Sequence, residues 1–104
     1  TTQWILATFG VVEDRRARSE EFAADGGHTV TELLELLERT YTRAVAVVET
    51  LSVAELLRPR VVQGYQETGL SAVLHVLEHC AGHAYQIYAA TKQALDVDLR
   101  FYDL

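Results

Sequence analysis

The chain has 104 residues, of which 49% are hydrophobic and 23% are charged, and its formal net charge at pH 7 is −6. This length predicts a single domain over residues 1–104, and this balance excludes a largely disordered protein. The acidic charge argues against a nucleic-acid-binding protein, because such domains carry a basic patch. No uncharged apolar run reaches the roughly 18 residues of a membrane span, so no membrane partner is expected.

The single cysteine, Cys80, cannot form an internal disulfide, which fits a reducing compartment. The first residues lack a basic segment followed by an apolar one, so no signal peptide is expected and the predicted location is the cytoplasm. The basic cluster of Arg15, Arg16 and Arg18 is flanked by acidic residues. We interpret it as a solvated helix face rather than an anion site.

The first helical segment is predicted over Thr2–Ala23, with Trp4 and Phe9 on one face. Gly10 is its weak point, since glycine in a helix interior costs about 1 kcal/mol relative to alanine. A break is therefore expected there. The run 24–27, Ala-Asp-Gly-Gly, indicates a loop.

The second helix has the clearest pattern. Thr29 followed by Glu32 has the spacing of a capping box, in which two side chains satisfy free backbone donors at a helix start. Apolar residues then recur at helical spacing, namely Val30, Leu33, Leu34, Leu37, Tyr41, Ala44, Val45 and Val48. Ser52 and Glu55 repeat the capping spacing, which predicts a short helix over residues 53–57.

The last long helix is predicted over residues 70–95. Before it, Pro59 disfavours helix at Arg58, and the polar stretch 60–69 is interpreted as an extended connection. The helix carries an apolar stripe of Leu70, Val73, Leu74, Leu77, Ala81, Ala84, Tyr88 and Leu95. Together these elements predict an all-α fold, an up-down helical bundle.

Only Glu78 and Lys92 are charged within this last helix. A helix with so few charges is usually covered on more than one side. The following tail is expected to dock back onto the bundle through Phe101, Tyr102 and Leu104.

Three histidines, His75, His79 and His83, follow one another at steps of four residues, so they lie along one side of the last helix, nearly opposite the apolar stripe. Two imidazoles at this spacing can bind one metal ion, and imidazole suits Zn, Ni, Cu or Fe. Catalytic zinc sites usually have three protein ligands. Candidates for the third are His28, a carboxylate such as Glu13 or Asp14, or a residue of a partner chain. The alternative is that the histidines are partly buried, hydrogen-bonded packing residues.

Two further sequence patterns are less specific. Residues 75–79 read H-x-x-E-H, the inverted zinc-protease pattern with Glu78 as general base, but five residues with two wildcards are a weak signal. Such a protease also needs a further ligand and a larger scaffold, so this interpretation is disfavoured. Cys80 lies about 100° around the helix from His79, and its expected role is a buried, inert thiol.

The stretch Gly69–Ile87, GLSAVLHVLEHCAGHAYQI, resembles the final helix of DinB-like (DinB/YfiT-type) domains. The tail segment 98–102 and the middle helix with the following Leu56–Pro59 fit the same layout, so the resemblance covers residues 29–102. Members of that superfamily are four-helix bundles, often dimers, with a three-histidine metal site. Some are thiol transferases that act with low-molecular-weight thiols such as bacillithiol or mycothiol.

By position, the resemblance implies that His79 and His83 are the two metal ligands of the last helix, with Zn, Ni or Fe as the ion. His75 and His28 are additional candidates. The family's first ligand lies within a hydrophobic segment like Trp4–Gly10, which here contains no histidine, and the chain is short of one helix. Either the chain is a truncated or divergent member, or part of the domain is absent, or a homodimer partner completes the bundle.

Two functions follow as expectations. The first is a DinB-like bundle that binds a divalent metal and is related to thiol transferases, with a small-molecule thiol as partner. The second is a non-catalytic helical module that self-associates, most simply as a homodimer, and whose metal site is degenerate. The sequence identifies no general base or nucleophile, so it does not decide whether the protein is an enzyme.

Overall fold

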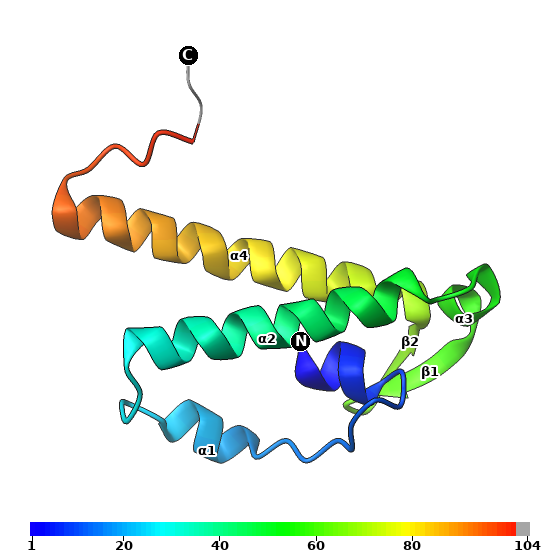
Figure 1. Ribbon diagram of the computed structural model, residues 1–104. Coiled ribbons are helices and arrows are strands. Elements are labelled where there is room, and N and C mark those ends of the chain that lie inside the picture. The colour runs from blue at the N-terminus through cyan, green and yellow to red at the C-terminus, as the bar shows by residue number, and fades with distance from the viewer. Residues whose placement is uncertain (102–104) are drawn as a thin grey trace.

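The computed structural model describes residues 1–101 and is mostly helical, with one small sheet (Figure 1). In chain order the elements are η1 (Thr2–Ala7), α1 (Arg18–Ala23), α2 (Val30–Glu49), α3 (Val53–Leu57), β1 (Pro59–Val62), β2 (Tyr65–Thr68) and α4 (Gly69–Leu95). The predicted all-α class is confirmed in its main features, and the two-stranded sheet is an addition to it. Within the described part of the chain, no helix is long and apolar enough to cross a membrane.

The predicted first helix is wrong in its extent. The chain forms two short helical pieces, η1 and α1, separated by residues 8–17. Gly10 has φ of 77°, in the left-handed region that favours glycine, and the next two backbone N–H groups both return to the Leu6 carbonyl. The helix ends at Ala7, three residues before Gly10, so the predicted break is found close to the glycine.

Both predicted capping boxes are confirmed. The Thr29 N–H donates to the Glu32 carboxylate at 2.7 Å, and the Glu32 N–H donates to the Thr29 hydroxyl at 3.2 Å. Ser52 and Glu55 do the same at the start of α3. A third box, made by Thr68 and Ser71, begins α4 and was missed because serine stands where glutamate or glutamine is usual.

The predicted extended connection before α4 is a β-hairpin. Its strands are antiparallel, with Pro59 opposite Thr68 and Val62 opposite Tyr65. The two turn residues, Gln63 and Gly64, both have positive φ, at 52° and 85°. This is the geometry of the tight turn that joins such strands, and it was missed because asparagine or aspartate usually precedes the glycine.

The buried core is small and lies around η1. Ile5 and Leu6 of η1 and Ala44 of α2 are buried together, and η1 contacts both α2 and α4. Partly buried residues pack against this cluster, namely Phe9, Val12, Val47, Val48, Val73 and Val76. Figure 1 shows the N-terminal part of α2 and the C-terminal part of α4 extending beyond η1, so the core cluster lies toward the other ends of these helices.

Most of the apolar stripe of α4 is not covered within the described chain, although Val73 packs against the core cluster. Leu74 and Leu77 are 53% and 66% exposed, and Leu70, Tyr88 and Leu95 are exposed as well. The helix packs instead through a different side, where Ala72 is fully buried. The expected docking of the tail is seen at Phe101, whose ring lies 4.8 Å from that of Tyr88 between centroids, whereas Tyr102 and Leu104 lie outside the described residues.

Candidate functional site

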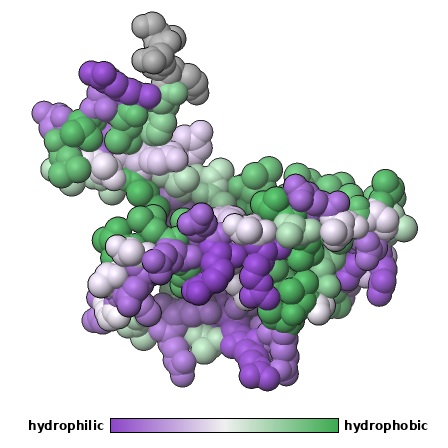
Figure 2. Space-filling model, viewed as in Figure 1, coloured by the Kyte–Doolittle hydropathy of each residue, from purple (hydrophilic) through white to green (hydrophobic). Residues whose placement is uncertain are grey.

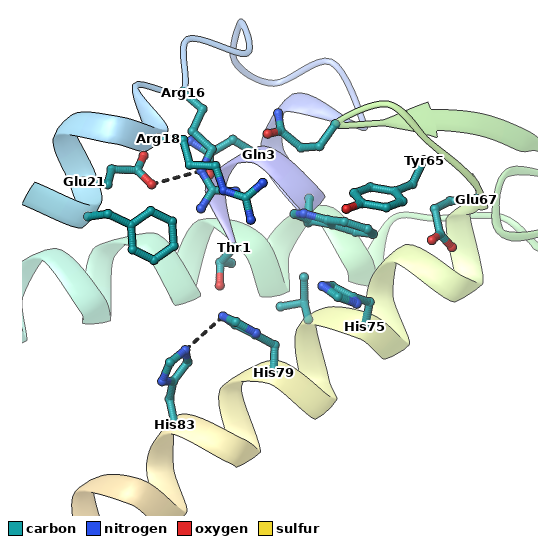
Figure 3. Close-up of a pocket in the computed structure, with 14 residues that line it drawn as sticks. Thr1, Gln3, Arg16, Arg18, Glu21, Tyr65, Glu67, His75, His79 and His83 are labelled. Atoms are coloured by element: carbon teal, nitrogen blue, oxygen red, sulfur yellow. Dashed lines mark hydrogen bonds and ion pairs between the residues drawn. The ribbon is translucent and has the colours of Figure 1, made fainter.

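A pocket of about 790 Å³ lies between η1, α1, β2 and α4 (Figure 3). This volume is in the range of small-molecule sites, which is roughly 300–1,000 Å³. Aromatic rings, guanidinium groups and imidazoles line it together, from Trp4, Tyr65, Arg16, Arg18, His75, His79 and His83. The pocket therefore collects the predicted histidines beside residues that are far from them in the sequence.

The imidazoles of His79 and His83 meet at the edge of this pocket. Their Nε2 atoms are 3.0 Å apart, as the dashed line in Figure 3 marks. On its other side the His83 ring places Nδ1 at 2.9 Å from the amide oxygen Oε1 of Gln86. Because an amide oxygen only accepts, Nδ1–H is the donor in this contact, and the Nε2 atom of His83 faces His79.

The pKa of His79 is lowered from the ordinary value of a histidine. Loss of hydration in the pocket is the largest cause, followed by the neighbouring imidazoles of His83 and His75 and by the guanidinium of Arg16. Loss of hydration and nearby positive charge each disfavour the charged imidazolium. A lowered pKa keeps His79 neutral near pH 7, which is the form that binds metal ions.

His75 occupies a different position from the other two histidines. Its ring stacks on the Trp4 indole, with centroids 3.9 Å apart and planes at 22°. It is also nearly parallel to the His79 ring, at 5.9 Å between centroids. Tyr65 flanks Trp4 at 6.1 Å. His75 therefore contacts Trp4 directly and lies next to His79.

The residues considered for a third ligand lie elsewhere. The Glu13 carboxylate accepts from the Arg15 Nε–H at 2.7 Å, and Asp14 accepts from the Arg16 backbone N–H at 3.3 Å and from the Gln63 side chain. Neither carboxylate lines the pocket, and His28 does not line it either. Among residues 1–101, no group of three or more His, Cys, Asp or Glu side chains is placed to hold a metal ion.

Two carboxylates that sequence reasoning missed do line the pocket. Glu21 forms an ion pair with Arg16 at 2.9 Å, and Glu67 accepts a hydrogen bond from the Ser71 hydroxyl. The interpretation of Arg16 and Arg18 as a purely solvated face is also incomplete, because both reach over the pocket in Figure 3. No local pattern signals this, since residues 8–17 form no regular element and tertiary contacts set their path.

Cys80 faces α2 rather than the pocket. The Tyr41 hydroxyl donates to its Sγ at 2.6 Å, and the Thr1 hydroxyl lies 3.8 Å from the same atom. The hydrogen bond to Cys80 is the largest cause that raises the pKa of Tyr41, because it favours the protonated phenol. The partly buried thiol therefore links α2 to α4, close to the packing role predicted for it.

Comparison with known proteins gives one match. A family model described as the DinB superfamily matches residues 2–87. No curated protein and no solved structure matches the chain. The matched residues run from η1 into α4 and include all three histidines of the pocket.

Proposed function

The chain belongs to the DinB superfamily, and from this premise we propose that His79 and His83 bind one divalent metal ion through their Nε2 atoms. The observation that carries the proposal is the 3.0 Å separation of these two atoms. Two nitrogen atoms that each lie about 2.0–2.1 Å from one zinc ion are about 3 Å apart. The pair therefore has the spacing of a two-histidine chelate, which forms when the proton on the His79 Nε2 atom moves to Nδ1.

The surroundings of the pair fit this role. Gln86 holds the Nδ1 proton of His83, as outer partners commonly do for metal-bound histidines, and the lowered pKa of His79 keeps its ring neutral. Two imidazoles suit Zn, Ni or Fe. With two protein ligands the ion binds less tightly than in a three-histidine site and leaves positions for water or for a ligand from solution.

A small-molecule thiol is the ligand class that we propose for the pocket. A divalent ion lowers the pKa of a thiol or water that coordinates it. Trp4 and Tyr65 offer an apolar wall for such a molecule, and Arg16 and Arg18 offer hydrogen-bond donors. Thiol transfer is the reaction class that family membership supports, and we assign no side chain of the pocket as a general base or nucleophile.

The single tryptophan makes the metal proposal directly testable, because Trp4 stacks on His75 beside the pair. Titration with Ni²⁺ should quench Trp4 fluorescence saturably in the wild type. His79→Ala and His83→Ala should each abolish the saturable phase, whereas His28→Ala, which removes a histidine outside the pocket, should leave it unchanged. Saturable quenching that persists in both pocket variants would show that the assigned ligands are wrong.

A non-catalytic, self-associating module is the second candidate function. It is favoured by the exposed apolar side of α4 and by a metal site with two protein ligands among the described residues. The two candidates differ in one outcome. A protein that takes up no Ni²⁺ or Zn²⁺ at pH 7.5 but forms stable dimers would support the module over the metalloprotein.

A further inference from the structure

A second pocket lies where the end of η1 meets the C-terminal end of α2, α3 and β1. It shares no residue with the pocket of His75, His79 and His83, which we call the histidine pocket. Its volume is about 500 Å³, also within the range of small-molecule sites. Figure 1 shows the end of α2, α3 and β1 together at one end of the molecule, and Figure 2 shows hydrophobic and hydrophilic residues beside one another at the surface there. The second pocket likewise has both apolar and charged walls, among them Phe9, Val11, Val47, Glu55, Arg58 and Arg60.

Arg60 is a partly buried cation in the wall of the second pocket. Its Cζ atom lies 4.6 Å from the centroid of the Phe9 ring, and its Nη1 donates to the Thr8 backbone carbonyl at 3.1 Å. These two contacts fix the position of the guanidinium without neutralising its charge. Its Nε atom is buried and has no hydrogen-bond partner among residues 1–101. A buried charged group that is only partly hydrogen-bonded is costly, so a bound anion would compensate it.

No carboxylate in residues 1–101 forms an ion pair with Arg60. Glu67 lies opposite Arg60 in the hairpin, but its carboxylate accepts a hydrogen bond from the Ser71 hydroxyl. Glu55 lines the second pocket, but its carboxylate is held in the capping box of α3. Arg58 brings a second guanidinium to the same pocket and also has no ion-pair partner in the described chain. In a chain of net charge −6, this pocket therefore combines two arginines with one carboxylate that is already engaged.

The rest of the lining favours one kind of anion. Thr50 and Leu51 bring the C-terminal end of α2 to the pocket, and the carbonyl groups at a helix C-terminus carry partial negative charge. That charge disfavours a dianion such as phosphate more than a carboxylate, which carries one charge. Phe9, Val11 and Val47 add apolar surface beside the guanidinium groups. The lining therefore suits a carboxylate that is attached to an apolar body.

From the two unpaired arginines, the apolar wall and the helix end, we propose that the second pocket binds a small organic carboxylate with an apolar body. The carboxylate lies between the guanidinium groups of Arg58 and Arg60, whose planar forks suit carboxylate oxygens. The apolar part of the ligand lies against Val11 and Val47. Because the second pocket shares no residue with the histidine pocket, the proposal stands independently of metal binding.

Calorimetric titration of the metal-free protein at pH 7.5 tests the proposal, with benzoate as the probe. Benzoate carries one carboxylate on an apolar ring, and benzamide is an uncharged molecule of nearly the same shape. Benzoate should bind saturably at one site per chain, and benzamide should bind at least about tenfold more weakly. Absence of saturable benzoate binding, equal binding of benzamide, or tighter binding of inorganic phosphate than of benzoate would overturn the proposal.

Arginine variants test where the carboxylate binds. Arg60→Gln should raise the benzoate dissociation constant about ten- to hundredfold, and Arg58→Gln about three- to tenfold because Arg58 is exposed. Exposure also means that Arg58→Gln should keep its helix content by circular dichroism, so it retains the test if Arg60→Gln disturbs the packing on Phe9. Arg16→Gln, the matched control in the histidine pocket, should bind benzoate as the wild type does. Benzoate binding that is lost in Arg16→Gln, or unchanged in Arg58→Gln, would place the carboxylate elsewhere and overturn the proposal.

Discussion

The two sides of α4 differ both in chemistry and in how far the rest of the chain covers them. The packed side presents β-branched residues, Val73 and Val76, to the cluster of η1, and the fully buried Ala72 also lies on the packed part of the helix. The open side presents exposed leucines and tyrosines, such as Leu74, Leu77 and Tyr85. Close approach of η1 requires small side chains, so the more hydrophobic side is left outside. Side-chain size, and not hydrophobicity alone, decides which side of this helix meets the core.

The largest expected effect comes from truncating a leucine on each side of this comparison. Leu6 of η1 is 1% exposed in the core, whereas Leu77 is 66% exposed on the open side of α4. Leu6→Ala should lower the free energy of unfolding by about 2–5 kcal/mol through lost burial and a cavity. Leu77→Ala should cost much less under dilute, monomeric conditions. Urea denaturation measures both, and equal losses would contradict the division into a packed and an open side.

A smaller effect, on metal affinity, is expected when His75 is replaced. It tests whether His75 helps to position the metal-binding histidines of α4. We predict that its stack on Trp4 positions the His79 ring. An aromatic pair contributes about 0.5–1.5 kcal/mol, so His75→Ala should weaken Zn²⁺ binding about two- to tenfold. His75→Phe retains a ring without a ligand nitrogen and should bind as the wild type does. If His75→Phe loses as much affinity as His75→Ala, the imidazole is a metal ligand instead.

The smallest effect is a pH dependence of stability. The pKa of His79 is lowered in the folded protein, so the unfolded chain binds a proton more readily between the lowered value and the ordinary value near 6.5. Stability should therefore rise with pH across that interval and fall as the medium is acidified through it. His79→Gln should flatten this slope in urea titrations at pH 5 to 7.5 without metal. A slope that is unchanged in His79→Gln would assign it to another group.

Local partners explain what could be predicted from the sequence. The capping boxes at Thr29 and Ser52 depend on a residue three positions away, and both were found. The meeting of His79 and His83 follows from helix geometry at a four-residue step. Gly10 marked the end of the first helical piece for an equally local reason, its positive φ.

Contacts between distant segments explain what could not be predicted. Arg16 and Arg18 line the pocket because of the path of residues 8–17, which no periodicity describes. The Gln63-Gly64 turn lacks the usual asparagine or aspartate, so the hairpin gave only a weak local signal. Similarly, the sequence showed that α4 is apolar on one side but not that η1 packs against the other.

Zinc content at equilibrium tests the central claim most directly. The protein is dialysed to equilibrium against Zn²⁺ at pH 7.5, and the metal bound per chain is measured by elemental analysis. The account predicts one ion per chain in the wild type and in His28→Ala, and little or none in His79→Ala and His83→Ala. A wild type that binds no zinc, or a full ion retained in both pocket variants, would contradict it.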